Sequence, residues 1–144
     1  GVDENLLDRI ANPQVSAETL EIKATAIRER EVEGAFAISD VGDVSNADAI
    51  PQAADELIRL EGITAAIVYG ARNGVLYLSG RSRDDRVHMG RAIESALEDV
   101  PSASGGGHAR MGGGQISLGD GGFVWPAREN TLTDRLWRAL EGDL

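Results

Sequence analysis

One stretch of the chain gathers residue types that could bind an anion. Residues 104–114 read SGGGHARMGGG, so that three glycines stand on each side of a segment holding His108 and Arg110. Successive backbone N–H groups of a glycine-rich loop can form a concave anion site. The two side chains would add donors at its rim, and the planar guanidinium of arginine suits a phosphate. The stretch predicts a phosphate-binding loop, and the alternative is a flexible surface loop with two incidental polar residues.

A second polar cluster, Ser79-Gly80-Arg81-Ser82-Arg83, follows a predicted strand. Alternation along the strand would place Arg81 and Arg83 on one face if the strand continues. Two arginines and neighbouring serine hydroxyls could bind a phosphate if this face meets the glycine loop. The alternative is that these arginines pair with Asp84, Asp85 and other surface acids.

The elements that must position these two motifs alternate between helical and strand patterns. Helices are predicted over residues 3–11, 16–31, 46–60 and 87–98, and from Thr131 or Thr133 to about Gly142; strands are predicted over 34–38, 63–69, 75–78, 115–118 and 123–125, and a loop over 41–45. Asn73-Gly74 predicts a tight hairpin between the second and third strands. The order predicts one α/β domain with a central mixed β-sheet flanked by helices.

Apolar residues at helical spacing predict which face of each helix is buried. The expected stripes are Leu20, Ala24 and Ile27; Ala53, Ala54, Leu57 and Ile58, with Pro51 in the first turn and Gly62 at the end of that helix; Met89, Ile93, Ala96 and Leu97; and Leu132, Leu136 and Leu140. We expect Met111 to be a packing residue as well, and His88 to lie on a helix surface.

The composition limits the class of protein. A chain of 144 residues fits one domain with a real hydrophobic core. The net charge is −10 and Lys23 is the only lysine among 14 basic residues, a composition similar to that of halophilic proteins. Such a field repels nucleic acid, so a polyanion site would need a local arginine cluster. The chain has no cysteine and no apolar run long enough to span a membrane, which favours a cytoplasmic protein without a membrane partner.

The two motifs and the segment between them resemble the DHHA1 domain. This domain is the C-terminal, substrate-binding half of DHH-superfamily phosphoesterases, which include RecJ-like exonucleases and nanoRNases. Ser79-Gly80-Arg81-Ser82 matches the Ser-x-Arg-Ser element of the family, and Gly105-Gly106-Gly107-His108 matches its Gly-Gly-Gly-His loop, in the same order and spacing. The resemblance covers about residues 32–119, and with the composition it suggests a haloarchaeal source.

The resemblance implies a division of labour between two domains. Residues 1–31 would be a helical connector from an N-terminal catalytic DHH domain, and residues 32–144 the DHHA1-like domain. In the family, manganese is bound in the N-terminal half by aspartates and histidines, including an Asp-His-His motif. This sequence has no such motif, and His88 and His108 are its only histidines. We therefore expect no metal ligands and no cofactor in this chain, and no phosphoesterase activity from it alone.

The resemblance also assigns roles to residues. The substrate phosphate would be bound by Ser79, Arg81, Ser82, Gly105, Gly106, Gly107, His108 and Arg110, with His108 also the catalytic donor to the phosphate and to the leaving oxygen. The expected partners are a short single-stranded nucleic acid or a nucleotide phosphate and the DHH domain, and a homodimer is compatible with this reading.

Two departures from the family pattern leave the substrate open. Ser104 stands where the family often has a fourth glycine, and Met111 with Gly112–Gly114 replaces the more usual alanines. RNA, single-stranded DNA, a cyclic dinucleotide and a mononucleotide all remain candidates. A different class of function is a tRNA-binding or dimerising accessory domain, because a related domain ends alanyl-tRNA synthetases. A third is a purely structural interaction domain.

Overall fold

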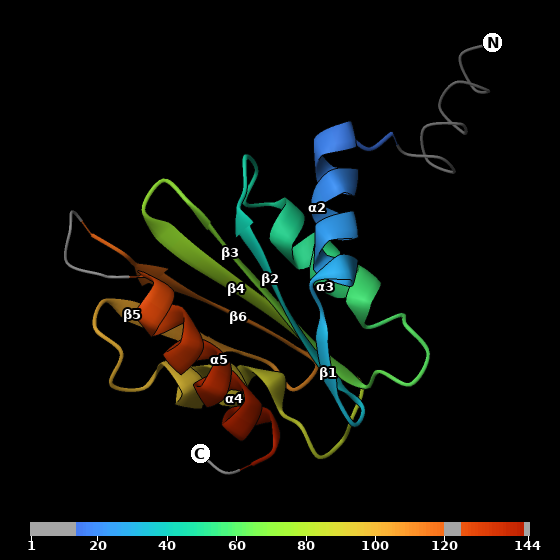
Figure 1. Ribbon diagram of the computed structural model, residues 1–144. Coiled ribbons are helices and arrows are strands. Elements are labelled where there is room, and N and C mark those ends of the chain that lie inside the picture. Colours follow the sequence, from blue (N-terminus) through green and yellow to red (C-terminus); the bar gives the residue numbers. More distant parts are fainter. Residues whose placement is uncertain (1–13, 120–124, 143–144) are drawn as a thin grey trace, which may run out of the picture.

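Helices and strands alternate along the chain much as the apolar pattern predicts. The computed structural model describes residues 14–119 and 125–142. The elements are α2 (Ala17–Arg28), β1 (Glu31–Glu33), β2 (Phe36–Asp43), α3 (Ala49–Leu57), β3 (Ala65–Arg72), β4 (Val75–Ser82), α4 (Met89–Leu97), β5 (Ala103–Gly107), β6 (Met111–Ser117) and α5 (Trp125–Leu140) (Figure 1).

The strands form one six-stranded mixed sheet in the order β1-β2-β3-β4-β6-β5. β2 and β3 are parallel, and every other neighbouring pair is antiparallel. The parallel pair is joined through α3, as a crossover connection requires. The predicted fold class, an α/β domain with a central mixed sheet flanked by helices, is confirmed.

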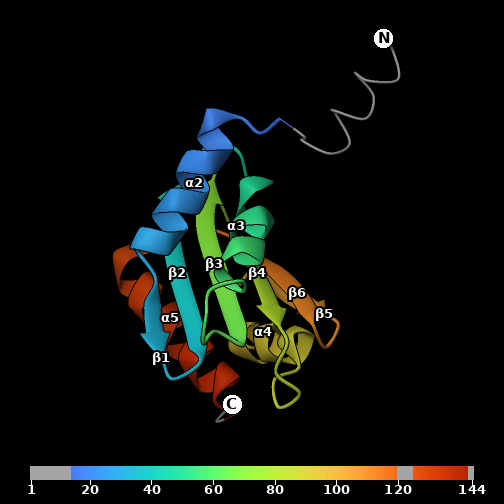
Figure 2. The ribbon, with the colours of Figure 1, turned by 90° about the vertical axis from the view of Figure 1, so that its right-hand side faces the viewer.

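Helices cover both faces of the sheet (Figures 1 and 2). α2 packs on β2, and α3 packs on β3 and β4; one apolar cluster, which includes Ile50, Leu57 and Val68, lies between these helices and the sheet. α4 and α5 lie on the other face over a second cluster that includes Ile67, Ile93 and Leu136. Two separate apolar layers therefore hold the sheet from both sides.

Several local predictions are confirmed. Asn73 and Gly74 have φ angles of 50° and 77°, as a type I′ hairpin turn between β3 and β4 requires. The predicted stripes of α4 and α5 are buried, and that of α3 is buried except for Ile58, which is half-buried. The Ser16 side chain caps α2 by accepting from the Thr19 N–H at 3.1 Å.

Other local predictions are wrong. The buried face of α2 presents Thr19, Ile22 and Ala26, whereas Leu20 and Ile27 of the predicted stripe are exposed. α2 also ends earlier than predicted, because the chain turns into β1. α3 ends at Leu57, so that Gly62 lies in the following turn rather than at the helix end.

Strand predictions also need correction at two places. β2 continues to Asp43, through most of the segment predicted to be a loop. Trp125 begins α5 instead of closing a terminal hairpin, so that residues 115–117 pair with β4 and β5. The predicted helix over 3–11 and the residues Phe123 and Val124 lie outside the described residues.

The largest correction concerns the glycine-rich stretch, which is a β-hairpin and not a loop. Gly105–Gly107 belong to β5 and Gly112–Gly114 to β6, joined by the turn 108–110. α4 lies unusually close to this hairpin: a Cβ added to Gly90 would stand 2.4 Å from the carbonyl carbon and oxygen of Gly107. Several of these glycines therefore serve the packing of α4 against the sheet, which the sequence interpretation did not consider.

Candidate functional site

An incompletely covered area of the sheet lies beside α3. Side chains alternate along β4, with Leu78, Gly80 and Ser82 buried toward α4. Their neighbours face the side of α2 and α3, and cross-strand partners share that face. We call this area the open face. It consists of Tyr77, Ser79 and Arg81 of β4, Met111, Gly113 and Gln115 of β6, and Ser104 and Gly106 of β5.

The middle row of the open face carries almost no side chains. Ser79 pairs with Gly113, which in turn pairs with Gly106 across the three strands. Figure 2 shows β6 and β5 extending beyond α2 and α3, and Met111 of β6 is 52% exposed. A planar ligand could therefore approach the sheet backbone closely along this row.

Arg81 is the cation of the open face. Its Nε donates to Asp55 Oδ1 of α3 at 2.6 Å, and its Nη1 donates to the Gly80 carbonyl at 2.9 Å. The Arg81 side chain is only 13% exposed, whereas that of Asp55 is 58% exposed. These two contacts leave Nη2 with both its hydrogens, so that the guanidinium can still donate to a ligand.

The other residues of the Ser79–Arg83 cluster do not join the site. Ser82 is buried toward α4, where its Oγ donates to the Val87 carbonyl at 2.9 Å, so its side chain lies on the opposite side of the sheet from the open face. β4 ends at Ser82, and Arg83 donates through Nε and Nη2 to the Ile63 carbonyl. Of the two predicted arginines, only Arg81 therefore faces the open face.

Asp84 and Arg86 form a structural pair next to the site. The Arg86 side chain donates to both carboxylate oxygens of Asp84, and Thr64 Oγ1 donates to Asp84 Oδ2 at 3.1 Å. The hydrogen bonds from Arg86 hold the pKa of Asp84 well below its usual range. Asp84 is thus the partner of an arginine, as the alternative interpretation of this cluster held, whereas Asp85 is exposed.

The two predicted motifs do lie side by side. Gly80 pairs with Gly112 and Arg81 with Met111, and the Ser82 N–H donates to the Arg110 carbonyl at 2.9 Å. The backbones of the two motifs are therefore neighbours in the sheet.

The hairpin turn is fixed by its main chain, and its polar side chains lie at the surface, where Arg110 Nη2 stands 3.7 Å from Asp85 Oδ1. The His108 carbonyl accepts from the Gly90 N–H and the Ala109 carbonyl from the Met89 N–H, both at 2.9 Å. His108 and Arg110 are exposed. Because N–H groups alternate in direction along a strand, Gly105–Gly107 cannot form the concave anion loop that the sequence suggested.

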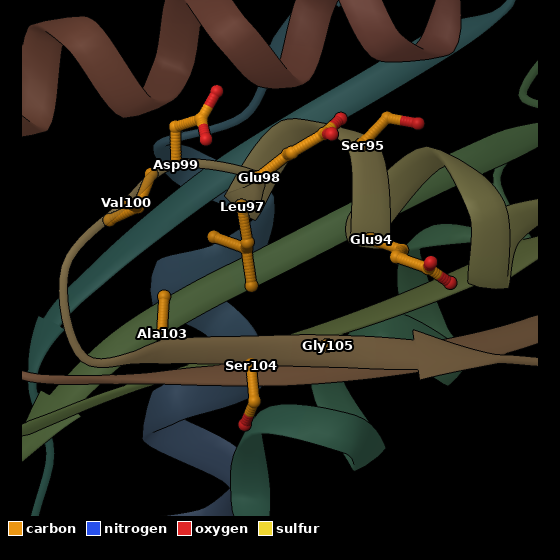
Figure 3. A pocket seen from close by; sticks show the side chains of 9 residues that line it. All are labelled: Glu94, Ser95, Leu97, Glu98, Asp99, Val100, Ala103, Ser104 and Gly105. Carbon is orange, nitrogen blue, oxygen red and sulfur yellow. The ribbon is translucent and has the colours of Figure 1, made fainter.

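Two pockets lie away from the open face. One, of about 440 Å³, lies between the end of α4 and β5, with Glu94, Glu98 and Asp99 on its wall (Figure 3). These carboxylates repel a phosphate. Figure 3 also shows the Ser104 side chain pointing to the opposite side of β5, as its place on the open face requires. The second pocket, of about 240 Å³, lies beside His88 and Arg110.

Two features are absent from the part of the chain that the structure describes. There, no three histidine or acidic side chains gather in a way that could hold a metal ion. Residues 14–119 and 125–142 contain no helix long and apolar enough to cross a membrane.

Sequence reasoning missed several members of the open face. Asp55 sits in a predicted helix with no local sign of its arginine partner, 26 residues further on. Met111 was expected to pack and is instead exposed beside Arg81. Tyr77 and Gln115 could have been found by extending the alternation from Arg81 along β4 and its partner strand.

Comparison with known proteins matches residues 33–141 to the family model of the DHHA1 domain. The chain is 36% identical over 119 residues to an uncharacterized protein of Methanocaldococcus jannaschii. The aligned region covers 82% of this chain and 24% of that protein. It thus spans about a quarter of that relative's length.

Two solved structures share the fold. The structure of an exopolyphosphatase-related protein from Bacteroides fragilis matches with a TM-score of 0.66 and 11% identity, over 96% of this chain and 39% of that one. The C-Ala domain of alanyl-tRNA synthetase from Aquifex aeolicus matches with a TM-score of 0.54 and 19% identity, over 74% of this chain and 96% of that domain.

Proposed function

The chain belongs to the DHHA1 domain family, and on this premise we propose that its open face binds the phosphate of a nucleotide or of a short single-stranded nucleic acid. One observation carries the proposal: Arg81 is a largely buried cation on the same face of the sheet as a strip without bulky side chains. An arginine in such a place supplies charge-assisted hydrogen bonds to an anion where water competes poorly.

The surroundings of Arg81 suit the other parts of a nucleotide. Met111 lies next to Arg81 on the neighbouring strand and offers an exposed apolar surface to a base or a ribose. The row Ser79–Gly113–Gly106 lets a flat group lie against the backbone, and Ser79 adds a hydroxyl. Phosphate and base would thus be bound on adjacent rows of one face.

His108 and Arg110 would act at the end of the same hairpin. Both are exposed, and their turn is tied to α4 and to the end of β4 through backbone hydrogen bonds. We propose that they donate to a phosphate that extends beyond Arg81, and that His108 donates to the leaving oxygen when a catalytic domain is present. The side chains of His108 and Arg110 would make these contacts, while backbone hydrogen bonds hold the turn in place.

We further propose that this domain presents the substrate to a manganese-dependent DHH domain, in a phosphoesterase of the RecJ or nanoRNase type. The M. jannaschii relative, of which this chain spans about a quarter, supports a longer protein. Manganese would supply the activated water, and its ligands would lie outside the described residues. The residues of this chain would bind the phosphate and hold it in one orientation.

Replacement of Arg81 tests the binding proposal. Arg81→Ala should weaken binding of 5′-AMP by about 1.5–3 kcal/mol, the usual worth of a hydrogen bond to a charged group. Arg81→Lys should restore it only in part, because an ammonium cannot form the forked contact. Affinities would be measured by ¹H–¹⁵N NMR titration with 5′-AMP and with a short oligoadenylate, at several salt concentrations.

A matched control is Arg59→Ala, which removes a positive charge from an arginine that contacts only Glu56, at 3.7 Å, among the described residues. This variant should bind like the wild type. Equal affinities for wild type, Arg81→Ala and Arg59→Ala would refute the proposed site. Binding of a tRNA acceptor stem with no response to 5′-AMP would instead favour the accessory-domain alternative.

A further inference from the structure

The acid that holds Arg81 differs from the partners of the neighbouring arginines. Arg86 is bound through two nitrogens to Asp84, which is itself buried and fixed by Thr64. Asp55, in contrast, accepts from Arg81 at one oxygen and is more than half exposed. The carboxylate of Asp55 can therefore turn into water without becoming buried or desolvated, and the cost of opening the pair falls on Arg81.

The two side chains of the Arg81–Asp55 pair differ in exposure, because Arg81 is largely buried and Asp55 is not. Arg81 is anchored on β4 by its contact with the Gly80 carbonyl and is largely buried, so it would be left without a counter-charge if Asp55 moved. A buried, unpaired charge is unfavourable, which means that another anion would be drawn to the same guanidinium. The geometry is that of an arginine with an exchangeable counter-ion.

We infer that Asp55 is the resident counter-anion of Arg81, which a ligand phosphate displaces from the guanidinium when it binds. This inference rests on the proposed function and adds a residue that sets the affinity of the site. Asp55 competes with the phosphate, both by occupying Nε and by placing a negative charge beside the ligand. Without a ligand, the negative charge of Asp55 cancels the positive charge of Arg81, in a chain whose net charge is −10.

The test is the change in affinity for 5′-AMP when the competing charge is removed. Asp55→Asn keeps the size of the side chain and should tighten binding by about two- to fivefold, the equivalent of losing one exposed ion pair. Asp55→Glu keeps a carboxylate within reach and should bind like the wild type. In an Arg81→Ala background, Asp55→Asn should have no effect, because Asp55 acts through Arg81.

A control separates this local effect from the change in overall charge. Glu56→Gln removes the same charge from the next residue of α3, which pairs with Lys23 and Arg59 and not with Arg81. It should leave the affinity nearly unchanged. Weaker binding by Asp55→Asn, equal binding, or an equal gain in Glu56→Gln would overturn the inference while leaving the proposed site intact. No binding of 5′-AMP by either wild type or Asp55→Asn would contradict the proposed function, and this inference with it.

Discussion

The close contact between α4 and the glycine hairpin makes a specific prediction for Gly90→Ala. A Cβ at this position would stand 2.4 Å from the carbonyl carbon and oxygen of Gly107, and 2.8 Å from its nitrogen. All three are backbone atoms of β5, so no side chain can turn away to make room. The hairpin would have to move off the helix.

The magnitude follows from what such a movement breaks. The N–H groups of Met89 and Gly90 donate to the Ala109 and His108 carbonyls, and each of these hydrogen bonds contributes about 1 kcal/mol net. Overpacking adds a cost of about 1–3 kcal/mol. The higher helix propensity of alanine returns about 1 kcal/mol. We therefore expect Gly90→Ala to lower the free energy of unfolding by about 2–4 kcal/mol.

The assay is urea unfolding of wild type, Gly90→Ala and a matched glycine variant. Gly106→Ala lies on the same hairpin but points away from the helix contact, with its nearest neighbour, Glu94 Oε2, 4.0 Å from the added Cβ. It should be neutral or stabilising by up to about 0.5–1 kcal/mol, since alanine loses less backbone entropy than glycine. A Gly90→Ala variant as stable as the wild type would refute the packing argument.

Two further predictions concern stability near the site. His88→Ala removes the acceptor of the Arg91 N–H, 3.1 Å from His88 Nδ1, and should cost about 0.5–2 kcal/mol in urea unfolding, with His88→Asn restoring most of it. The lowered pKa of Asp84 means that its contribution to stability is complete above the unfolded pKa of about 3.9 and is lost as the pH falls below it. Arg86→Met should therefore be less stable than the wild type at pH 7 and lose less stability between pH 5 and pH 3; parallel losses would contradict the role of this pair.

Local patterns were enough to predict elements whose signals lie within a few residues. Asn73-Gly74 needs positive φ at both positions, so the turn type and the register of β3 and β4 follow from two residues. The stripe of α4 is the only apolar one on that helix, and Met89, Ile93 and Leu97 are buried accordingly. These predictions hold because few alternatives compete with them.

α2 shows why a helical stripe does not always identify the buried face. Leu20, Ala24 and Ile27 form one apolar row, but Ile22 and Ala26 form another on the same helix. The sheet selects the second row, where Ser39 Oγ also donates to the Ala26 carbonyl. Which row is buried depends on how α2 is rotated about its axis when it packs on β2, and local periodicity carries no information on that rotation.

β5 and the glycine-rich first half of β6 were missed because glycine carries neither hydrophobicity nor strand propensity. Their pairing with β4 is a non-local property: Gly112 lies opposite Gly80, 32 positions earlier in the chain. The contact of Arg81 with Asp55 is likewise set by how α3 packs on β4. The sequence could thus identify Arg81 as a candidate, while the acid that neutralises it required the tertiary structure.

The most direct test of the open face is to map 5′-AMP binding on the ¹⁵N-labelled chain by ¹H–¹⁵N chemical-shift perturbation. We expect the largest amide shifts on Ser79, Arg81, Gly106 and Gly113, with smaller ones in the turn that holds His108. Largest shifts in the acidic pocket between α4 and β5, or none at millimolar 5′-AMP, would contradict it.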